Sequence, residues 1–186
     1  MSRTRGAKKS RRRRAAGKLI LVLGGAASGK SDIALRLSGG KTPKAFVATG
    51  QGLDAEMSTR IARHQATRSS DWATFEIPVD MAQWFGDHAN GYSTIVIDCV
   101  TLWLSNLQEQ GKDDSAIKDK VSELLKVMRS SPATIVLVSN ELGMGLVPVG
   151  ESVRKFRDLA GWVNQQIAAA ADEVHLVVSG IALRMK

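Results

Sequence analysis

The chain has few of the residues that cross-link extracellular or zinc-stabilised domains. Its 186 residues include a single cysteine, Cys99, and three histidines. One cysteine excludes an intramolecular disulfide, and the sequence offers no Cys/His cluster for a structural zinc ion. A lone thiol in an apolar segment is typical of a buried, inert cysteine in a reducing compartment. We therefore expect a cytoplasmic protein.

Long hydrophobic runs are also missing. No apolar segment approaches the roughly 18–20 residues that a membrane-spanning helix needs. The basic N-terminus and the short apolar run 19–23 have the outline of a twin-arginine secretion signal. Cleavage after Ala27 would, however, remove the strand and part of the glycine-rich loop described below. We therefore expect neither a membrane span nor export.

Acidic residues are absent from residues 1–17, which carry eight of the 26 lysines and arginines. The other 18 basic residues equal the 18 acidic ones, so the net charge of +8 belongs to this tail. With no apolar periodicity, the tail is expected to be disordered. A solvated extension, a misassigned start and an anchor for an anionic surface all fit it. The neutral remainder, residues 18–186, is expected to be one domain that does not bind nucleic acid.

The most informative segment is a glycine-rich loop between a strand-like and a helix-like run. The apolar residues 19–23 lead into it, and residues 32–38 continue as a helix. The pattern is G-x-x-x-x-G-K-[ST], in the strand–loop–helix context that a phosphate-binding loop requires. Its members are Gly24, Gly25, Ala26, Ala27, Ser28, Gly29, Lys30 and Ser31.

Each part of this loop has a physical role toward a nucleotide. Small residues let backbone N–H groups turn inward around phosphate oxygens, and the following helix directs its positive end at them. Lys30 can reach the β and γ phosphates, and the Ser31 hydroxyl can bind Mg²⁺. Asp98 ends the apolar strand TIVID, the usual position of a second Mg²⁺ ligand. The other interpretation of Asp98 is a cap for the next helix.

Strand-like and helix-like segments alternate along the chain. Strands are expected at 19–23, 44–49, 74–77, 94–100, 133–139, 174–179 and, as a short edge, 181–185. Helices are expected at 32–38, 54–66, 81–88, 101–110, 116–129 and 152–171. This order predicts an α/β fold of the P-loop NTPase type, a mostly parallel sheet with helices on both faces. Sites in such sheets lie at the carboxyl ends of strands, where Gly24, Thr49, Glu76, Asp98 and Asn140 fall.

One histidine stands apart from the others. His64 lies among three arginines on the helix expected at 54–66, and a neutral imidazole beside cations is a competent nucleophile toward phosphorus. A single histidine on a helix is more often simply exposed, so the residues alone do not decide its role. His88 and His175 are expected to be structural or solvent-facing.

Several longer stretches resemble one enzyme family. They are LVLGGAASGKS, FVATGQGLDAEMSTRIARHQATR, TIVIDCVTLWLSNL, VLVSNELGMGLVP and RKFRDLAGWVNQQIAAAADEVHLVVSGI. The runs NE-x-GMG-x-VP, from Asn140 to Pro148, and FRD-x-AG-x-VNQ are the most discriminating. The chain is similar to the bifunctional adenosylcobinamide kinases/adenosylcobinamide-phosphate guanylyltransferases of cobalamin biosynthesis. The similarity runs from Leu19 to the C-terminus and leaves out the basic tail.

The resemblance implies two reactions at one nucleotide site. The γ-phosphoryl of ATP or GTP passes to the aminopropanol hydroxyl of adenosylcobinamide. GTP then guanylylates a histidine, which the family motif places at His64, and the corrinoid phosphate takes up the GMP. The resemblance also implies Mg²⁺, a homo-oligomer with a trimer as the form to test, and a nucleotide-side or substrate-side role for Asn140 and Glu141. It places contacts to the guanine nucleotide at Ala48, Thr49, Gly50, Gln65, Ala66, Thr67, Arg68 and Glu76.

Two other functions stay open from the sequence. The first is another small-molecule kinase with the same phosphate loop, in which His64 takes no part and no covalent GMP forms. The second is a nucleic-acid-associated protein that binds through its arginine-rich tail and uses the nucleotide site as a switch.

Overall fold

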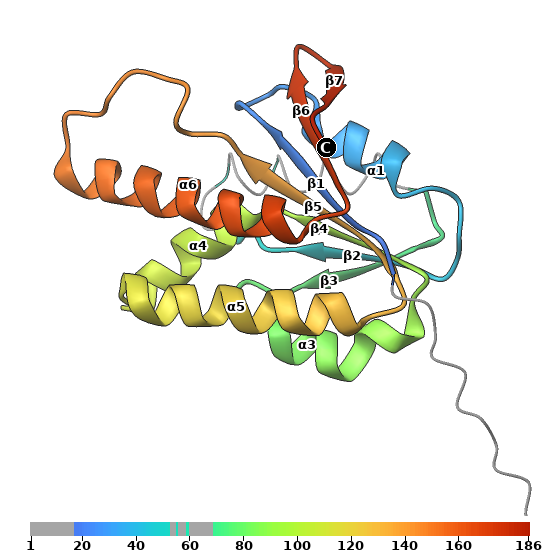
Figure 1. Cartoon of the computed structure of the whole chain (residues 1–186). Helices are drawn as coiled ribbons and strands as arrows, with labels where there is room; N and C mark the ends of the chain where they lie inside the picture. The colour runs from blue at the N-terminus through green and yellow to red at the C-terminus, as the bar shows by residue number, and fades with distance from the viewer. Residues whose placement is uncertain (1–16, 53–54, 56–58, 60–68) are drawn as a thin grey trace, which may run out of the picture.

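The computed structural model describes residues 17–52, 55, 59 and 69–186. Within them, one seven-stranded sheet has the strand order β3-β2-β4-β5-β1-β6-β7 (Figure 1). Every neighbouring pair is parallel except β6 and β7, which are antiparallel at one edge. The strands are β1 (Leu19–Gly24), β2 (Lys44–Ala48), β3 (Trp72–Glu76), β4 (Thr94–Asp98), β5 (Thr134–Asn140), β6 (Glu173–Val178) and β7 (Ile181–Arg184).

Helices cover both faces of the sheet, unequally in the described part of the chain. One face packs against four α-helices and the other against α1, and each face has its own cluster of buried side chains. On the four-helix face are α3 (Met81–His88), α4 (Val100–Glu109), α5 (Asp114–Ser130) and α6 (Glu151–Ala170); α1 spans Lys30–Leu37, and a 3-10 turn, η1, spans Ala89–Gly91.

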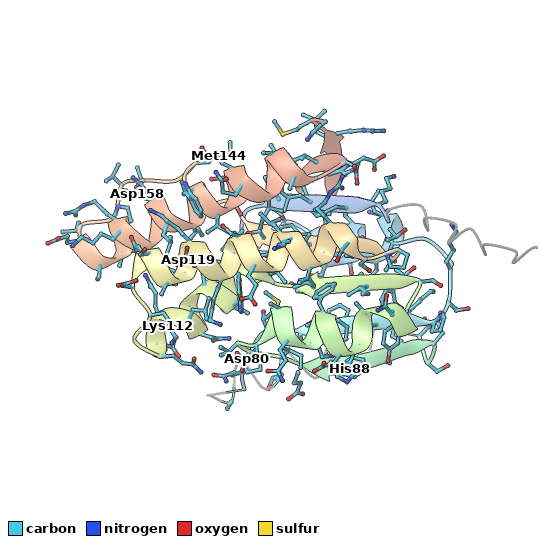
Figure 2. The ribbon with its side chains drawn as sticks, turned by 60° about the horizontal axis from the view of Figure 1, so that its bottom comes forward. Asp80, His88, Lys112, Asp119, Met144 and Asp158 are labelled. Carbon is cyan, nitrogen blue, oxygen red and sulfur yellow. The ribbon has the colours of Figure 1, made fainter. Side chains whose placement is uncertain are left out.

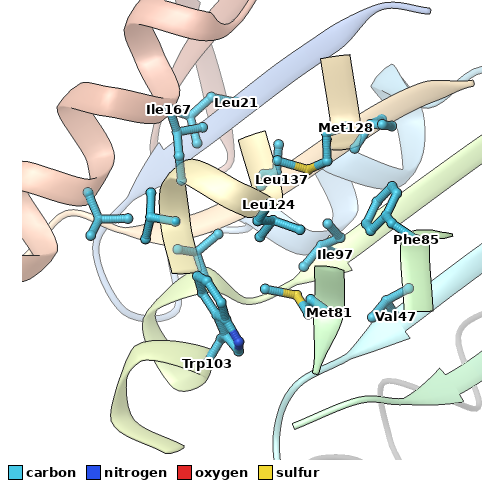
Figure 3. Close-up of a cluster of buried hydrophobic side chains, with 14 of the residues drawn as sticks. Leu21, Val47, Met81, Phe85, Ile97, Trp103, Leu124, Met128, Leu137 and Ile167 are labelled. Atoms are coloured by element: carbon cyan, nitrogen blue, oxygen red, sulfur yellow. The ribbon is translucent and has the colours of Figure 1, made fainter. Parts of the chain in front are cut away.

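Successive side chains of the central strands point to opposite faces of the sheet and so fill both cores. Leu21, Ile97 and Leu137 point to the four-helix face and are fully buried (Figure 3). Their neighbours Val22 and Val136 point to the α1 face and are also fully buried. A strand buried on both faces has no solvent side, which explains why these strands read as continuous apolar runs.

The α/β fold with a mostly parallel sheet is confirmed, including the antiparallel C-terminal edge. The first helix begins at Lys30, two residues before the expected start, directly after the left-handed Gly29. The strand expected over 94–100 ends at Asp98, and α4 begins at Val100. The expected tail and most of the helix at 54–66 lie outside the described residues. Among the helices that are described, none is long and apolar enough to cross a membrane.

Asp172 joins three elements at the amino-terminal side of the sheet. Its Oδ2 accepts a hydrogen bond from the backbone N–H of Leu19 at 2.8 Å, and the Arg129 guanidinium donates to the same oxygen at 2.9 Å. Asp172 itself lies between α6 and β6. The bond from Leu19, followed by that from Arg129, holds the pKa of Asp172 below its ordinary value of 3.8.

The variant Asp172→Asn should therefore melt at a lower temperature than the wild type at pH 7. A carboxyl whose pKa is lowered on folding stabilises the protein above its unfolded-state pKa, and this contribution is lost as the pH falls through the folded-state value. The difference in Tm should accordingly shrink below about pH 4. Thermal unfolding by circular dichroism across this range measures it, with Asp119→Asn, an exposed acid on α5 (Figure 2), as the control. Equal effects of both variants would contradict the role of Asp172.

Candidate active site

The loop between β1 and α1 follows the path that a phosphate-binding loop needs. Gly29 has φ +89°, in the left-handed region where glycine carries no steric cost. A Cβ at Gly24 would lie 2.4 Å from the Val177 carbonyl oxygen and 2.7 Å from the Ser28 hydroxyl. The first glycine therefore lets the loop leave the sheet close to β6, and the last lets it enter the helix.

Two polar side chains are held inside this loop. Lys30 is only 8% exposed, and its ammonium group donates a hydrogen bond to the Gly25 carbonyl at the start of the loop. The Ser28 hydroxyl is buried, and the described residues offer it no hydrogen-bond partner. A buried hydroxyl without a partner is costly, and a phosphate oxygen in the loop would satisfy it.

The end of α1 nearest the loop contacts the end of β4. The Ser31 hydroxyl donates a hydrogen bond of 2.6 Å to Oδ2 of Asp98. A hydroxyl and a carboxylate are the hard oxygen ligands that Mg²⁺ prefers, and Mg²⁺ usually takes its remaining ligands from phosphates and water. The two residues therefore fit this ion. No cluster of three or more His, Cys, Asp or Glu side chains suited to a metal occurs among the described residues.

The ends of β2 and β4 are joined by Thr49. Its fully buried hydroxyl donates to the Cys99 carbonyl at 2.7 Å and accepts from the Cys99 N–H at 2.8 Å. The Thr49 N–H bonds the Asp98 carbonyl, and the Asn106 amide donates to the carbonyls of Thr49 and Pro78 at 2.8 and 2.9 Å. The backbone on both sides of the Asp98 carboxylate is thus fixed by buried hydrogen bonds.

Cys99 takes part through its backbone, while its thiol is buried beside Asp98. Burial, and secondly the negative charge of Asp98, raise the pKa of Cys99 to about 11. The thiol is thus protonated at neutral pH and is a poor nucleophile, in agreement with the inert buried cysteine predicted from the sequence.

A second set of hydrogen bonds fixes the end of β5. The Thr101 hydroxyl accepts from the Asn140 N–H at 2.9 Å and lies 3.3 Å from the Ser139 hydroxyl. Ser139 donates to the Asn164 side chain at 2.7 Å, and Asn164 donates to the Asn140 carbonyl at 3.0 Å. This closed ring links α4, β5 and α6. It sets the direction in which the chain leaves β5, where Glu141 N–H donates to the Gly24 carbonyl at 3.0 Å.

The structure brings most of the predicted residues to one edge of the sheet. The loop 24–31, Asp98 and the start of the 140–150 loop meet there, with Ala48, Thr49 and Gly50 at the end of the neighbouring β2. Glu76 ends β3 opposite Ala48 and is exposed. His64, Gln65, Ala66, Thr67 and Arg68 lie outside the described residues, so their roles stay predictions.

Sequence reasoning assigned no role to two residues at this edge, Asn106 and Arg157. Asn106 is the one amide among the buried residues of α4, and its position one turn after Trp103 was a usable signal. Arg157 belongs to the FRD run that carried the family resemblance, and it lines a cavity beside the loop. An arginine on the inner side of an amphipathic helix was the signal there.

The chain is similar to proteins of a known enzyme family. The family model described as CobU, cobinamide kinase / cobinamide phosphate guanyltransferase, matches residues 20–185. The chain belongs to this family. Its members include the bifunctional adenosylcobalamin biosynthesis protein CobU of Escherichia coli K12, 41% identical over 180 residues, which cover 90% of this chain and 99% of the relative.

The chain is also similar to a second curated relative and to one solved structure. The bifunctional adenosylcobalamin biosynthesis protein CobP of Pseudomonas aeruginosa PAO1 is 40% identical over 167 residues, or 89% of this chain and 96% of the relative. The RadB recombinase structure matches 87% of this chain and 74% of its own, with a TM-score of 0.51 and 19% identity. At that identity the likeness concerns the fold.

Replacement of Asn106 tests the hydrogen bonds that fix the backbone at the ends of β2 and β4. Asn106→Ala leaves the carbonyls of Thr49 and Pro78 without their donor, and we expect the free energy of unfolding to fall by about 2–4 kcal/mol. Urea denaturation measures it. The exposed Asn90→Ala is the control and should stay within about 0.5 kcal/mol of the wild type. If the free energy of unfolding of Asn106→Ala also stayed within about 0.5 kcal/mol of the wild type, the two carbonyls would not depend on this amide.

Proposed function

We propose that this chain phosphorylates adenosylcobinamide and then converts the product to adenosylcobinamide-GDP. The observation that carries the proposal is the phosphate loop whose Ser31 contacts Asp98, in a chain that belongs to the cobinamide kinase / cobinamide phosphate guanyltransferase family. Relatives that it matches over about 90% of its length are named as bifunctional enzymes of adenosylcobalamin biosynthesis. The corrinoid is accordingly the proposed acceptor, and ATP and GTP are the proposed donors.

In the first reaction, the aminopropanol hydroxyl attacks the γ-phosphorus of ATP or GTP. A new O–P bond forms and the hydroxyl proton is released to water, while the bond to the β-phosphate oxygen breaks and the nucleoside diphosphate leaves with its electron pair. The loop N–H groups and Lys30 hold the phosphates and offset the negative charge that develops on them. Ser31 and Asp98 would hold Mg²⁺, which would supply further positive charge to offset the negative charge of the phosphates.

In the second reaction, a ring nitrogen of His64 attacks the α-phosphorus of GTP. An N–P bond forms and pyrophosphate leaves with the electron pair of the broken P–O bond. The phosphate oxygen of the corrinoid product then attacks the same phosphorus, the N–P bond breaks, and the ring nitrogen recovers its electron pair. Two displacements at a reactive N–P bond replace one difficult condensation of two anions.

The remaining predicted contacts belong to the guanine nucleotide. Family resemblance, rather than position in the described structure, supports the set Ala48, Thr49, Gly50, Gln65, Ala66, Thr67, Arg68 and Glu76. Thr49 is fully buried, and its hydroxyl, N–H and carbonyl already bond Cys99, Asp98 and Asn106, so it would serve the nucleotide by positioning its neighbours Ala48 and Gly50. We further propose that residues 18–186 act as one catalytic domain within a homo-oligomer, with a trimer as the form to test.

The guanylylated histidine is tested by labelling. Protein incubated with α-³²P-GTP should retain an acid-labile label, whereas γ-³²P-GTP should leave none, because pyrophosphate carries the γ-phosphorus away. His64→Asn should lose the label, and His88→Asn, at the exposed end of α3, should keep it. Retained labelling in His64→Asn would overturn the assignment. Unlabelled wild type with intact phosphorylation would indicate a kinase alone.

Lys30 is tested in the phosphorylation step. Lys30→Ala should reduce phosphorylation of adenosylcobinamide about 100-fold or more, since it removes the cation that stabilises charge on the transferred phosphoryl group. The control is Lys41→Ala, an exposed lysine that precedes β2 and therefore lies toward the opposite end of the sheet. Turnover by Lys30→Ala equal to that of the control would count against the loop as the site of phosphoryl transfer.

A further inference from the structure

A cavity of about 490 Å³ lies between the loop that follows β5 and the helix α6. Its wall includes Leu23, the residue before the phosphate loop, and Glu141, whose N–H is bonded to Gly24. The cavity therefore adjoins the phosphate loop. Leu23 packs with the four-helix core, whereas α1, which follows the phosphate loop, packs on the opposite face of the sheet. A ligand in the cavity would approach the loop from the side away from α1.

The cavity wall contains a cation without a close anionic partner. The Arg157 side chain is only 20% exposed, yet among the described residues its one carboxylate within 4 Å is that of Asp158, at 3.8 Å. The Asp158 side chain is 76% exposed and is directed largely to solvent. At 3.8 Å the contact with Asp158 is too long for a hydrogen bond, and no side chain or carbonyl of the described residues accepts one from the Arg157 guanidinium. A largely buried guanidinium without a hydrogen-bonded anion is suited to bind an anion that can accept two parallel hydrogen bonds, as a phosphate does.

The rest of the wall suits a large ligand with both apolar and amide groups. Half-buried Trp162 gives an apolar side, and Gly161 leaves open space where a side chain would project. Glu141 and Gln165 can hydrogen-bond to amides. Beyond the cavity the loop exposes apolar side chains, among them Met144 at 77%, which Figure 2 shows at the same end of the molecule as Asp158.

We propose that this cavity binds the phosphorylated arm of the corrinoid, with the Arg157 guanidinium on its phosphate and the ring resting on the exposed apolar loop. The inference rests on the proposed function. The cavity is smaller than a whole corrinoid with its amide side chains, so it admits the arm and its neighbouring amide groups. Its place opposite α1 also suits the reaction, because attacking and leaving oxygens lie in line on two sides of the transferred phosphorus. Arg157 would thus favour the phosphorylated corrinoid over the unphosphorylated one.

The test compares Arg157→Met and Arg157→Lys with the wild type in three measurements. These are the KM for adenosylcobinamide phosphate in GMP transfer, the KM for adenosylcobinamide in phosphorylation, and labelling by α-³²P-GTP. Arg157→Met should raise the first KM at least about tenfold, as loss of a charge-assisted hydrogen bond does, and leave the other two within about twofold. Arg157→Lys should fall between, because an ammonium keeps the charge and loses the paired geometry.

Lys155→Met is the matched control, since it removes an exposed cation of the same helix and should change none of the three measurements. Equal increases of both KM values, or no change in either, would overturn the proposal. Loss of labelling in Arg157→Met would assign the guanidinium to a nucleotide phosphate instead. Spectroscopic titration of the two corrinoids without nucleotide gives a separate readout. If the wild type takes no label, that titration still tests Arg157, and the proposed function alone fails.

Discussion

The hydrogen bond between Ser31 and Asp98 is the contact on which the candidate site depends. It joins the first turn of α1 to the end of β4, although β5 lies between β4 and β1 in the sheet. The contact is available because parallel strands end at the same edge, with Asp98 opposite Val138 and Gly24 opposite Asn140. A loop folded over that edge then brings a hydroxyl and a carboxylate together, two hard oxygens of the kind that would suit Mg²⁺.

Buried hydrogen bonds hold this edge in place on both sides of the contact. Thr49 and Asn106 fix the backbone around Asp98, and the ring through Asn164 fixes the end of β5. A buried polar group left without a partner costs free energy, so each network favours one arrangement of the strand ends.

Sequence alone predicted the fold, and it predicted that the glycine-rich loop and Asp98 lie at the same sheet edge, because both depend on local patterns. Apolar strands, helical spacing and the glycine-rich loop are each read within about ten residues, and the position of Asp98 follows from the end of one strand. Thr49 bonds Cys99 and Asn106, which lie 50 and 57 residues later in the chain, and the cavity beside Arg157 joins Leu23 to a helix still further away. The spacing of apolar residues along the sequence does not predict contacts of this kind. The neighbouring arginines singled out His64 as a candidate, but its role as the nucleophile rests on family resemblance and stays a prediction.

The unequal faces of the sheet give the proposed reactions a spatial order. The phosphate loop leads into α1 on one face, while the cavity with Arg157 lies under α6 on the other, and the two meet where Glu141 is bonded to Gly24. A triphosphate held by the loop would thus present its phosphorus atoms at the rim of the cavity. An acceptor on the α6 side need not displace the nucleotide to reach them. One sheet edge could then serve two successive transfers, with the phosphate made in the first becoming the group that Arg157 binds in the second.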